Sequence, residues 1–239
     1  MTHTNASAGA SPAPKNLIAR LIGIIVAPRA TYESVVAHPT WFGMMALTTV
    51  LVAGLIGGFL MTKVGQEAWL DAASSSPGVT AQAIEGMQKM APYVGYITAA
   101  SMLIFMPIIV VVMAGILYAV FNAALGGNAT FKQVFAVVVH AGPIGVLSQL
   151  FTVPLNYARG SMTSGTSLYV LVQSFVDETS FLGRFLGMIE IFLVWQLIVL
   201  SIGLAVLYRR KTQPIATSLL ALFVVIAVIV AFIRRGAGA

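Results

Sequence analysis

The sequence contains five apolar runs long enough to cross a lipid bilayer as helices, and this feature limits the fold more than any other. A helix needs about 20 apolar residues to cross the hydrocarbon, and every run matches or exceeds that length. None of the runs alternates polar and apolar residues, which argues against membrane-spanning strands. The sequence therefore predicts an all-α, polytopic integral membrane bundle with five transmembrane helices, at residues 42–62, 93–122, 131–153, 184–207 and 215–233.

The charge content supports the same interpretation. Only 8% of the 239 residues are charged and 59% are hydrophobic, whereas a soluble domain is about one-quarter charged. The net charge of +6 comes from basic residues placed singly or in pairs at the ends of apolar runs. This placement is typical of a membrane protein and argues against a nucleic-acid partner. The chain contains no cysteine, which excludes disulfides and cysteine-based catalysis.

The amino-terminal region is predicted to lie outside the spans. Residues 1–14 are small and polar and are expected to form a disordered tail. Residues 15–40 are expected to form a pair of interfacial amphipathic helices, because their apolar residues recur at helical spacing in stretches too short to span. Arg20 lies opposite the first apolar stripe, Pro28 ends the first helix, and Pro39 follows the second.

The lysine and arginine positions favour a cytoplasmic amino terminus in a cell (inner or cytoplasmic) membrane. With this orientation the cytoplasmic side carries seven basic residues and the opposite side six, and the most basic internal loop, residues 208–214, is cytoplasmic. Because the number of spans is odd, the carboxyl terminus is expected on the opposite side. The predicted interfacial anchors are Arg20, Arg29, Trp41, Arg209, Arg210 and Lys211.

Two segments between the runs are long enough to hold structure. Residues 63–92 contain Ser76-Pro77, a helix-start signal, and are expected to form one small surface helix. The apolar stretch at residues 168–177 is too short to span and is expected to be interfacial or re-entrant. Within the first run, the spacing Gly54-x-x-x-Gly58 would allow close approach of a neighbouring helix.

Ionisable residues inside a span are candidates for function, because a charge there costs about 2.5–3.5 kcal/mol on insertion scales. The candidate intramembrane polar site consists of Glu190, His140, Gln196 and Ser148. Glu190 is either a titrating or cation-pairing site inside the bundle, or a carboxyl near the outer interface that is neutral or paired with Arg184. His140 either relays a proton or binds a ligand, or makes a polar contact with a neighbouring helix.

Proline and glycine predict helix kinks in two runs. Pro107 lies in the second run, and Gly142-Pro143 lies in the third. Pro143 cannot donate to the carbonyl of Val139, which leaves an acceptor free near the middle of that helix. Broken helices around a site in mid-membrane are typical of transporters. Transport of a small solute, an ion or a lipid is therefore an alternative hypothesis, although five spans do not divide into inverted repeats.

Several short motifs, taken in order, resemble the Yip1-domain family of multi-pass membrane proteins. They are residues 27–32 with Val35, His38-Pro39 and Trp41 before the first span, residues 126–134 before the third, and residues 189–195 and 200–205 in the fourth. The resemblance implies a five-helix membrane domain, here residues 41–235, with a cytoplasmic amino terminus. The short amino-terminal tail resembles the prokaryotic branch more than the eukaryotic members linked to Rab-type GTPases. The resemblance supplies no catalytic residues.

The sequence contains no metalloprotease, phosphate-loop or serine-hydrolase motif, and its three histidines are dispersed. We therefore expect a non-enzymatic protein, without a metal or other cofactor, that acts through protein or lipid contacts. Its expected role is membrane organisation or complex formation. Its expected partners are the lipid bilayer and a membrane protein or a second copy of the chain.

Overall fold

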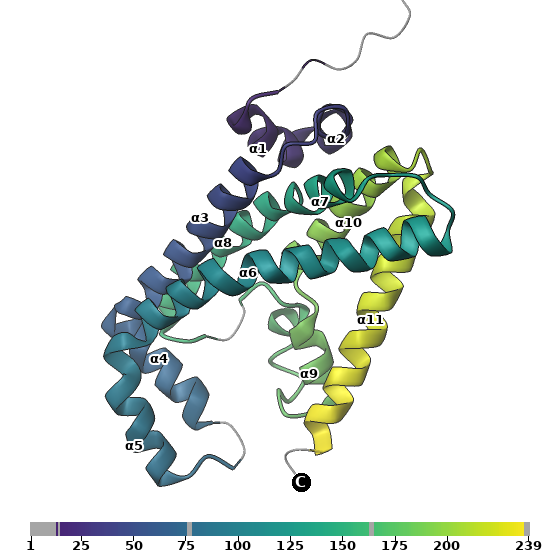
Figure 1. Cartoon of the computed structure of the whole chain (residues 1–239). Coiled ribbons are helices and arrows are strands. Elements are labelled where there is room, and N and C mark those ends of the chain that lie inside the picture. Colours follow the sequence, from purple (N-terminus) through teal and green to yellow (C-terminus); the bar gives the residue numbers. More distant parts are fainter. Residues whose placement is uncertain (1–12, 14, 76–77, 163–164, 237–239) are drawn as a thin grey trace, which may run out of the picture.

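The structure is a computed structural model that describes residue 13 and residues 15–75, 78–162 and 165–236. Its regular elements are helices, with one isolated bridge between Ser167 and Glu190. The long or well-formed helices are α1 (Leu17–Val26), α2 (Pro28–Ala37), α3 (Phe42–Met61), α4 (Lys63–Ser74), α5 (Ala81–Met90), α6 (Val94–Tyr118), α7 (Phe131–Val139), α8 (Gly142–Arg159), α9 (Phe181–Met188), α10 (Ile191–Leu207) and α11 (Thr212–Gly236) (Figure 1). Three short turns complete the set: η1 (Ala91–Tyr93), η2 (Ala119–Ala124) and η3 (Leu168–Leu171). The all-α fold class is confirmed, and the expected tail lies outside the described residues except for Ala13.

Four helical segments of the described chain are long and apolar enough to cross a membrane. They are Phe42–Met61, Ala81–Ala124, Phe131–Arg159 and Thr212–Ile233. The expected fourth span, residues 184–207, is divided: α9 ends at Met188, and the 17 residues of α10 begin at Ile191. The helical membrane bundle is thus confirmed, with four long segments, one of which is divided between α7 and α8, and with the shorter pair α9 and α10 in place of a fifth continuous span.

Hydrogen bonds to a returning loop explain why the chain leaves the helix between α9 and α10. Ile189 and Glu190 are extended, with ψ angles of 95° and 134°. The amide of Leu168 donates to the carbonyl of Ile189 at 2.9 Å, and the amide of Ile191 donates to the carbonyl of Thr166 at 3.2 Å. Irregular backbone at membrane depth must have such partners, because lipid supplies none.

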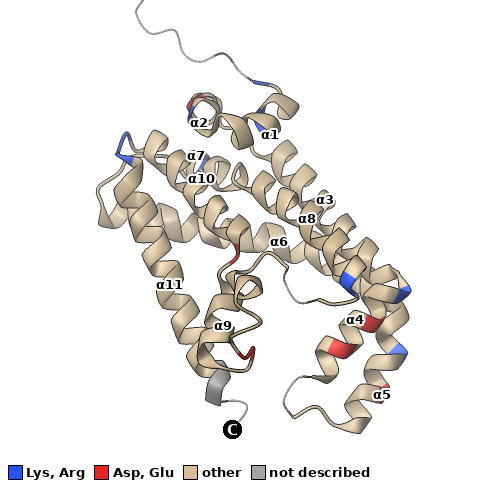
Figure 2. Ribbon diagram, turned by 180° about the vertical axis from the view of Figure 1, so that it is seen from behind, with Lys and Arg blue, Asp and Glu red and all other residues tan. Residues whose placement is uncertain are grey.

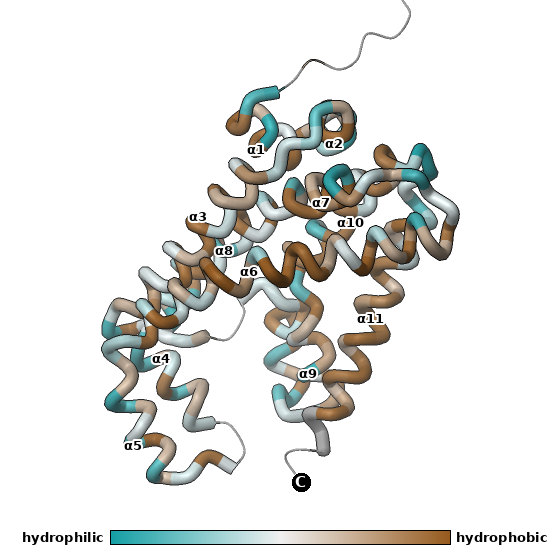
Figure 3. The backbone as a smooth tube through the Cα atoms, viewed as in Figure 1, coloured by the Kyte–Doolittle hydropathy of each residue, from teal (hydrophilic) through white to brown (hydrophobic). Residues whose placement is uncertain are grey.

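The segment formed by α7 and α8 lies at the centre of the bundle. In its most apolar window 67% of the residues are buried inside the protein, against 11% for the segment containing α6 and 17% for α11. The buried core joins α2, α3, α7, α8 and α10 through Tyr32, Met44, Val137, Ile144 and Leu204. Apolar residues dominate the outward-facing α6 and α11 (Figure 3), as expected for helices that face lipid.

Helices α1 and α2 lie across one end of the bundle (Figure 1). Tyr32 of α2 is fully buried, and its hydroxyl donates to the carbonyl of Val137 at 3.3 Å. Its ring lies against Gly203 of α10, where an added Cβ would come within 2.7 Å of the ring. The absence of a side chain at position 203 therefore allows α2 to dock on α10.

The opposite end of the bundle carries α4, α5 and α9 (Figure 1). The segment 63–92 forms two helices, whereas the sequence analysis predicted one; Ser76 and Pro77 lie outside the described residues. Thr80 caps α5 by accepting from the amide of Ala83 at 3.2 Å. The stretch 168–177 contains only the short turn η3, and its interfacial or re-entrant placement stays a prediction.

Candidate functional site

The break between α7 and α8 borders two cavities of different chemistry. His140 ends α7, and Pro143 lies in the first turn of α8, where its missing N–H costs no hydrogen bond. An added Cβ on Gly142 would lie 3.2 Å from the hydroxyl of Thr48, so α3 passes close to the break. The helix is divided just before Gly142-Pro143, whereas α6 continues through Pro107 without a break, and a kink at either place stays a prediction.

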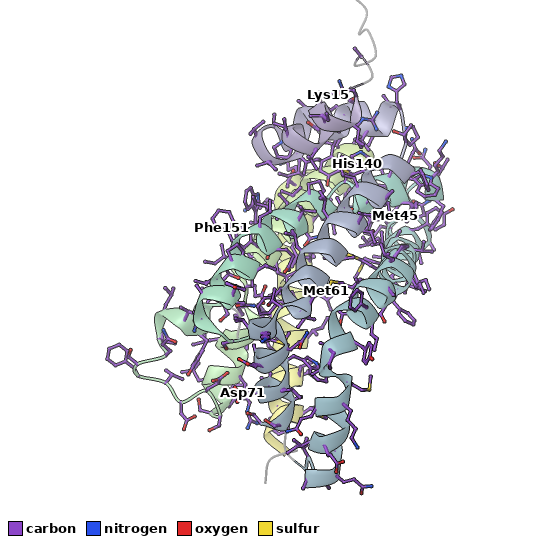
Figure 4. The ribbon with its side chains drawn as sticks, turned by 90° about the vertical axis from the view of Figure 1, so that its left-hand side faces the viewer. Lys15, Met45, Met61, Asp71, His140 and Phe151 are labelled. Carbon is purple, nitrogen blue, oxygen red and sulfur yellow. The ribbon has the colours of Figure 1, made fainter. Side chains whose placement is uncertain are left out.

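The first cavity is small and polar and lies beneath α1. It has a volume of about 150 Å³ and is lined by Lys15, Leu17, Arg20, Thr40, Gly43, Met44 and His140. Its lining contains two cationic side chains and no carboxylate. Figure 4 shows Lys15 and His140 at the same end of the bundle, far from Asp71. We call this space the α1 cavity.

Arg20 is held inside the protein by three acceptors. Its side chain donates to the carbonyl of Lys15 at 3.0 Å, the hydroxyl of Thr40 at 2.7 Å and the carbonyl of His38 at 3.2 Å. The residue is only 4% exposed, and burial lowers the pKa of its guanidinium. The interfacial role predicted for Arg20 stays a prediction; the structure shows its guanidinium turned inward, with acceptors before α1 and in the loop before α3.

His140 lines the same cavity and is fully buried. Its Nδ1 lies 2.7 Å from the carbonyl oxygen of Ala136, one turn earlier in α7. Its Nε2 is buried and has no hydrogen-bond partner among the described residues. The ring therefore hydrogen-bonds within its own helix. Among the described residues, its Nε2 makes no hydrogen bond to a neighbouring helix.

The second cavity is apolar and lies between α6 and α11. It has a volume of about 540 Å³, with walls from α3, the α7–α8 break, α6, α10 and α11. An adjoining cavity of about 340 Å³ shares Leu117, Leu219 and Leu222 with it and extends to Arg210 and Ser218. We call the two together the α6–α11 crevice. Its lining is mostly apolar, and Gln196, Thr48 and Thr49 are polar residues of the larger cavity.

The structure does not bring the four predicted polar residues into one site. His140 lines the α1 cavity, whereas Gln196 lines the α6–α11 crevice. Ser148 is buried in α8. Glu190 is half-buried at the start of α10, beside the bridge to Ser167, and it forms no ion pair with Arg184 within the described part of the chain.

The predicted anchors other than Arg20 lie at the same end of the bundle as α1 and α2. Arg29 is exposed and pairs with Glu33 at 3.6 Å. The ring of Trp41 packs on Phe135, with ring centroids 5.0 Å apart. Among Arg209, Arg210 and Lys211, Arg210 donates to the carbonyl of Leu125 at 3.1 Å. The interfacial role of these residues stays a prediction.

A polar contact that the sequence analysis missed joins the α10–α11 turn to η2, the short element that follows α6. The hydroxyl of Tyr208 donates to Oδ1 of Asn122 at 2.7 Å, and the ring of Tyr208 stacks on Phe121 with centroids 4.9 Å apart. The Nδ2 of Asn122 donates to the carbonyl of Ala129 at 2.6 Å. Asn122 and Tyr208 stand out in the sequence as polar residues at the ends of two apolar runs, but no sequence pattern indicates that they contact each other.

Charges are distributed unevenly along the bundle. Five of the seven acidic residues lie in α4, α5 and the segment before α9 (Figure 2). In α1 and α2 the acidic residue is Glu33, and it already forms an ion pair with Arg29. Among the described residues no three His, Cys, Asp or Glu side chains lie together in a way that could hold a metal ion.

Comparison with known proteins gives one match. A family model described as the Yip1 domain matches residues 22–233, which is most of the chain. Neither a search of curated proteins nor a search of solved structures finds a match.

Proposed function

This chain belongs to the Yip1 domain family, and from that premise we propose that it is a non-enzymatic membrane protein that acts by holding a phospholipid in the α6–α11 crevice. The observation that carries the proposal is the size and chemistry of that crevice. Binding sites for small molecules have volumes of roughly 300–1,000 Å³ and mostly apolar walls with a few polar groups. Both cavities of the crevice fall in that range.

The position of the crevice favours a lipid over a water-soluble ligand. Helices α6 and α11 are the least buried long segments of the bundle. A cavity between them is reached from the hydrocarbon of the bilayer. Met106, Met113 and Phe223 line it, and the flexible methionine side chains adapt to an irregular hydrocarbon chain.

The crevice also has one polar end that suits a headgroup. Arg210 and Ser218 lie beside the smaller cavity. Arg210 donates one hydrogen bond to the carbonyl of Leu125, and an arginine carries five N–H donors in all. The remaining donors are available to a phosphate oxygen at the level of the α10–α11 turn, with the acyl chain directed toward the larger cavity.

Photocrosslinking tests this proposal directly. The purified protein is reconstituted in phosphatidylcholine vesicles that contain a phospholipid with a diazirine on its acyl chain, and labelled peptides are mapped after irradiation. The test variant is Gly145→Leu, because Gly145 lines the crevice and an added Cβ would meet only the amide oxygen of Gln196, at 3.9 Å. The control is Gly54→Leu, at an exposed position of α3 with no neighbour within 4 Å.

We expect label on Met106 and Met113 in the wild type, a severalfold loss in Gly145→Leu, and no loss in Gly54→Leu. The added side chain fills space that the acyl chain would otherwise occupy. Label spread evenly over the lipid-facing surface of α3, α6 and α11, unchanged in Gly145→Leu, would exclude a specific lipid in the crevice.

A transporter is the second candidate, and one observation favours it. Two segments are broken, between α7 and α8 and between α9 and α10, and broken helices are typical of transporters. A flux assay on the purified protein in liposomes separates the two hypotheses. Solute movement that is lost in Glu190→Gln would favour transport, whereas the lipid-binding proposal predicts no solute flux in either protein.

A further inference from the structure

The α1 cavity is lined by two cationic side chains and by a buried histidine nitrogen that has no hydrogen-bond partner among the described residues. Its lining includes Lys15, Arg20 and His140 but no carboxylate. The acidic residue of the overlying helices, Glu33, is exposed and already paired with Arg29. A buried polar atom without a hydrogen bond is costly and calls for an explanation such as a missing ligand. The Nε2 of His140 is such an atom.

Lys15 and Arg20 both have hydrogen-bond donors to spare. The ammonium of Lys15 donates once, to the hydroxyl of Thr31 at 3.1 Å, and carries three donors. Arg20 donates from Nε, Nη1 and Nη2 to one acceptor each, which leaves one N–H on each terminal nitrogen. The cavity thus offers an anion several donors that carry positive charge.

The tautomer of His140 narrows the chemistry of that anion. Because Nδ1 lies 2.7 Å from a carbonyl oxygen, Nδ1 carries the hydrogen, and Nε2 of the neutral ring presents a lone pair. A ligand that fits must therefore bring a hydrogen to Nε2 and negative oxygens to Lys15 and Arg20. Phosphate monoesters, whose second pKa is about 6, and free phosphate, whose second pKa is higher, both carry a hydrogen and negative oxygens in mildly acidic solution. Sulfate and phosphodiesters carry no such hydrogen near neutral pH.

We propose that the α1 cavity binds a phosphate group that carries one hydrogen, either free phosphate or the monoester headgroup of a lipid. The P–OH donates to Nε2 of His140, and the charged oxygens accept from Lys15 and Arg20. The volume of about 150 Å³ admits a phosphate group and excludes a bulky headgroup. Helix α1 exposes Ile18, Ile22 and Val26 on its outer side, which would place the cavity at the headgroup level if α1 lies in the interface.

The experiment measures the thermal unfolding midpoint of the full-length protein by tryptophan fluorescence at pH 6.5. In one arm the detergent-solubilised protein is titrated with sodium phosphate or, at equal ionic strength, sodium sulfate. In the other arm it is embedded in phosphatidylcholine nanodiscs that contain phosphatidic acid, a monoester, or phosphatidylglycerol, a diester. A ligand that binds the folded state raises the midpoint, and the rise grows with the logarithm of the ligand concentration once that concentration exceeds the Kd.

We expect phosphate or phosphatidic acid to raise the midpoint, and sulfate and phosphatidylglycerol to leave it almost unchanged. The arm that responds identifies the source of the phosphate group. Lys15→Gln and His140→Asn should each weaken binding roughly tenfold, as expected for loss of one hydrogen bond to a charged ligand. The asparagine can keep the contact with Ala136 while removing Nε2. Lys132→Gln, an equal change of charge on an exposed residue outside the cavity, should bind like the wild type.

Three results would overturn the proposal: no response to either phosphate source, equal responses to phosphate and sulfate, or unchanged binding in Lys15→Gln. Lys15 is only half-buried, so its variant tests the site even if His140→Asn does not fold. The inference does not depend on the proposed function, because Gly145→Leu alters the crevice and not the α1 cavity. That variant should therefore bind phosphate normally.

Discussion

At the scale of single residues, Tyr208 links two segments that are 86 positions apart in the chain. Its hydroxyl donates to Asn122, and its ring stacks on Phe121. Removing the half-buried hydroxyl of Tyr208 would leave Oδ1 of Asn122 without this donor. The loss of stability then includes the cost of the unsatisfied acceptor as well as the lost hydrogen bond. Tyr208 therefore ties the turn between α10 and α11 to η2, alongside the hydrogen bond from Arg210 to the carbonyl of Leu125.

Replacing Tyr208 by phenylalanine tests this link. Tyr208→Phe removes the hydrogen bond and keeps the stacked ring, so the free energy of unfolding should fall by about 1 kcal/mol. Denaturant unfolding in detergent, followed by circular dichroism, measures the change. Tyr157→Phe is the control, since Tyr157 is exposed. Equal stabilities of the two variants would show that the hydroxyl of Tyr208 contributes nothing.

The same contact predicts a dependence on pH. Burial, with a smaller contribution from Tyr118, raises the pKa of Tyr208 to about 12 from its usual 10.0. The folded state therefore favours the neutral phenol, and this stabilisation is complete below pH 10 and is lost as the pH rises toward 12. We expect the stability difference between the wild type and Tyr208→Phe to shrink across that interval. A constant difference from pH 9 to pH 12 would contradict the assignment.

Single residues were also where the sequence was least informative. Helical spacing placed Arg20 on the side of α1 opposite the apolar residues, which the structure bears out. Spacing alone could not tell whether that side faces water or the protein. In the same way, the extent of the apolar run placed Glu190 inside a span. In the structure Glu190 forms a bridge with Ser167, in a loop more than 20 residues earlier in the chain.

At the scale of helices, α3 and α6 make their closest approach at two glycines. An added Cβ on Gly57 would lie 2.7 Å from the Cβ of Ala99 and 3.1 Å from the carbonyl oxygen of Gly95. The spacing of Gly54 and Gly58 had suggested a contact through those two glycines, but an added Cβ at either position would meet no neighbouring atom within 4 Å. Close packing between the two helices therefore depends on Gly57 of α3 and Gly95 of α6.

Substituting adjacent glycines by leucine tests the α3–α6 contact. Gly57→Leu should destabilise the bundle by about 1–3 kcal/mol, the usual cost of adding volume to a packed interface. Gly58→Leu should be nearly neutral, because its side chain would face open space. The two midpoints of thermal unfolding in the same detergent provide the comparison. A larger loss in Gly58→Leu would mean that a different face of α3 packs on α6.

The sequence predicted helix positions well and helix rotations poorly, for a physical reason. The bounds of α3 and α11 lie close to the expected ones, because a long apolar run between polar residues marks its own ends. A helix that is apolar all round has no periodicity to show which face is buried. The sequence analysis also missed the break between α9 and α10. Residues 184–207 contain no proline that would mark a break, and the hydrogen bonds that favour it come from another segment.

At the scale of the whole molecule, the two ends of the bundle carry different structures. One end has α1, α2 and the α10–α11 turn, and the other has α4, α5 and α9 (Figure 1). The order of the apolar runs predicted which segments share an end, whereas the placement of lysine and arginine gave only the orientation in the membrane, which stays a prediction. The sequence could not predict the α6–α11 crevice, because a crevice depends on how far two helices diverge and not on what either contains.

Single cysteines can test the predicted orientation, since the chain has none of its own. Lys132→Cys and Lys211→Cys should react with a membrane-impermeant maleimide only from the cytoplasmic side. Glu85→Cys and Asp177→Cys should react only from the opposite side; all four positions are exposed. Reversal of both pairs would contradict the orientation, and a split within either pair would contradict the arrangement of the bundle.

The hydrogen bond between Tyr208 and Asn122 has a consequence for whether the protein can assemble from two separate fragments. The loop from Leu125 to Ala129 is largely exposed, and α7 starts independently, with a capping box between Thr130 and Gln133. The covalent connection there is therefore dispensable once both halves are in the bilayer. Residues 1–126 and 127–239, synthesised as separate polypeptides in one cell, should co-purify through a tag on either half, and the Tyr208→Phe exchange should reduce the yield of the reassembled pair.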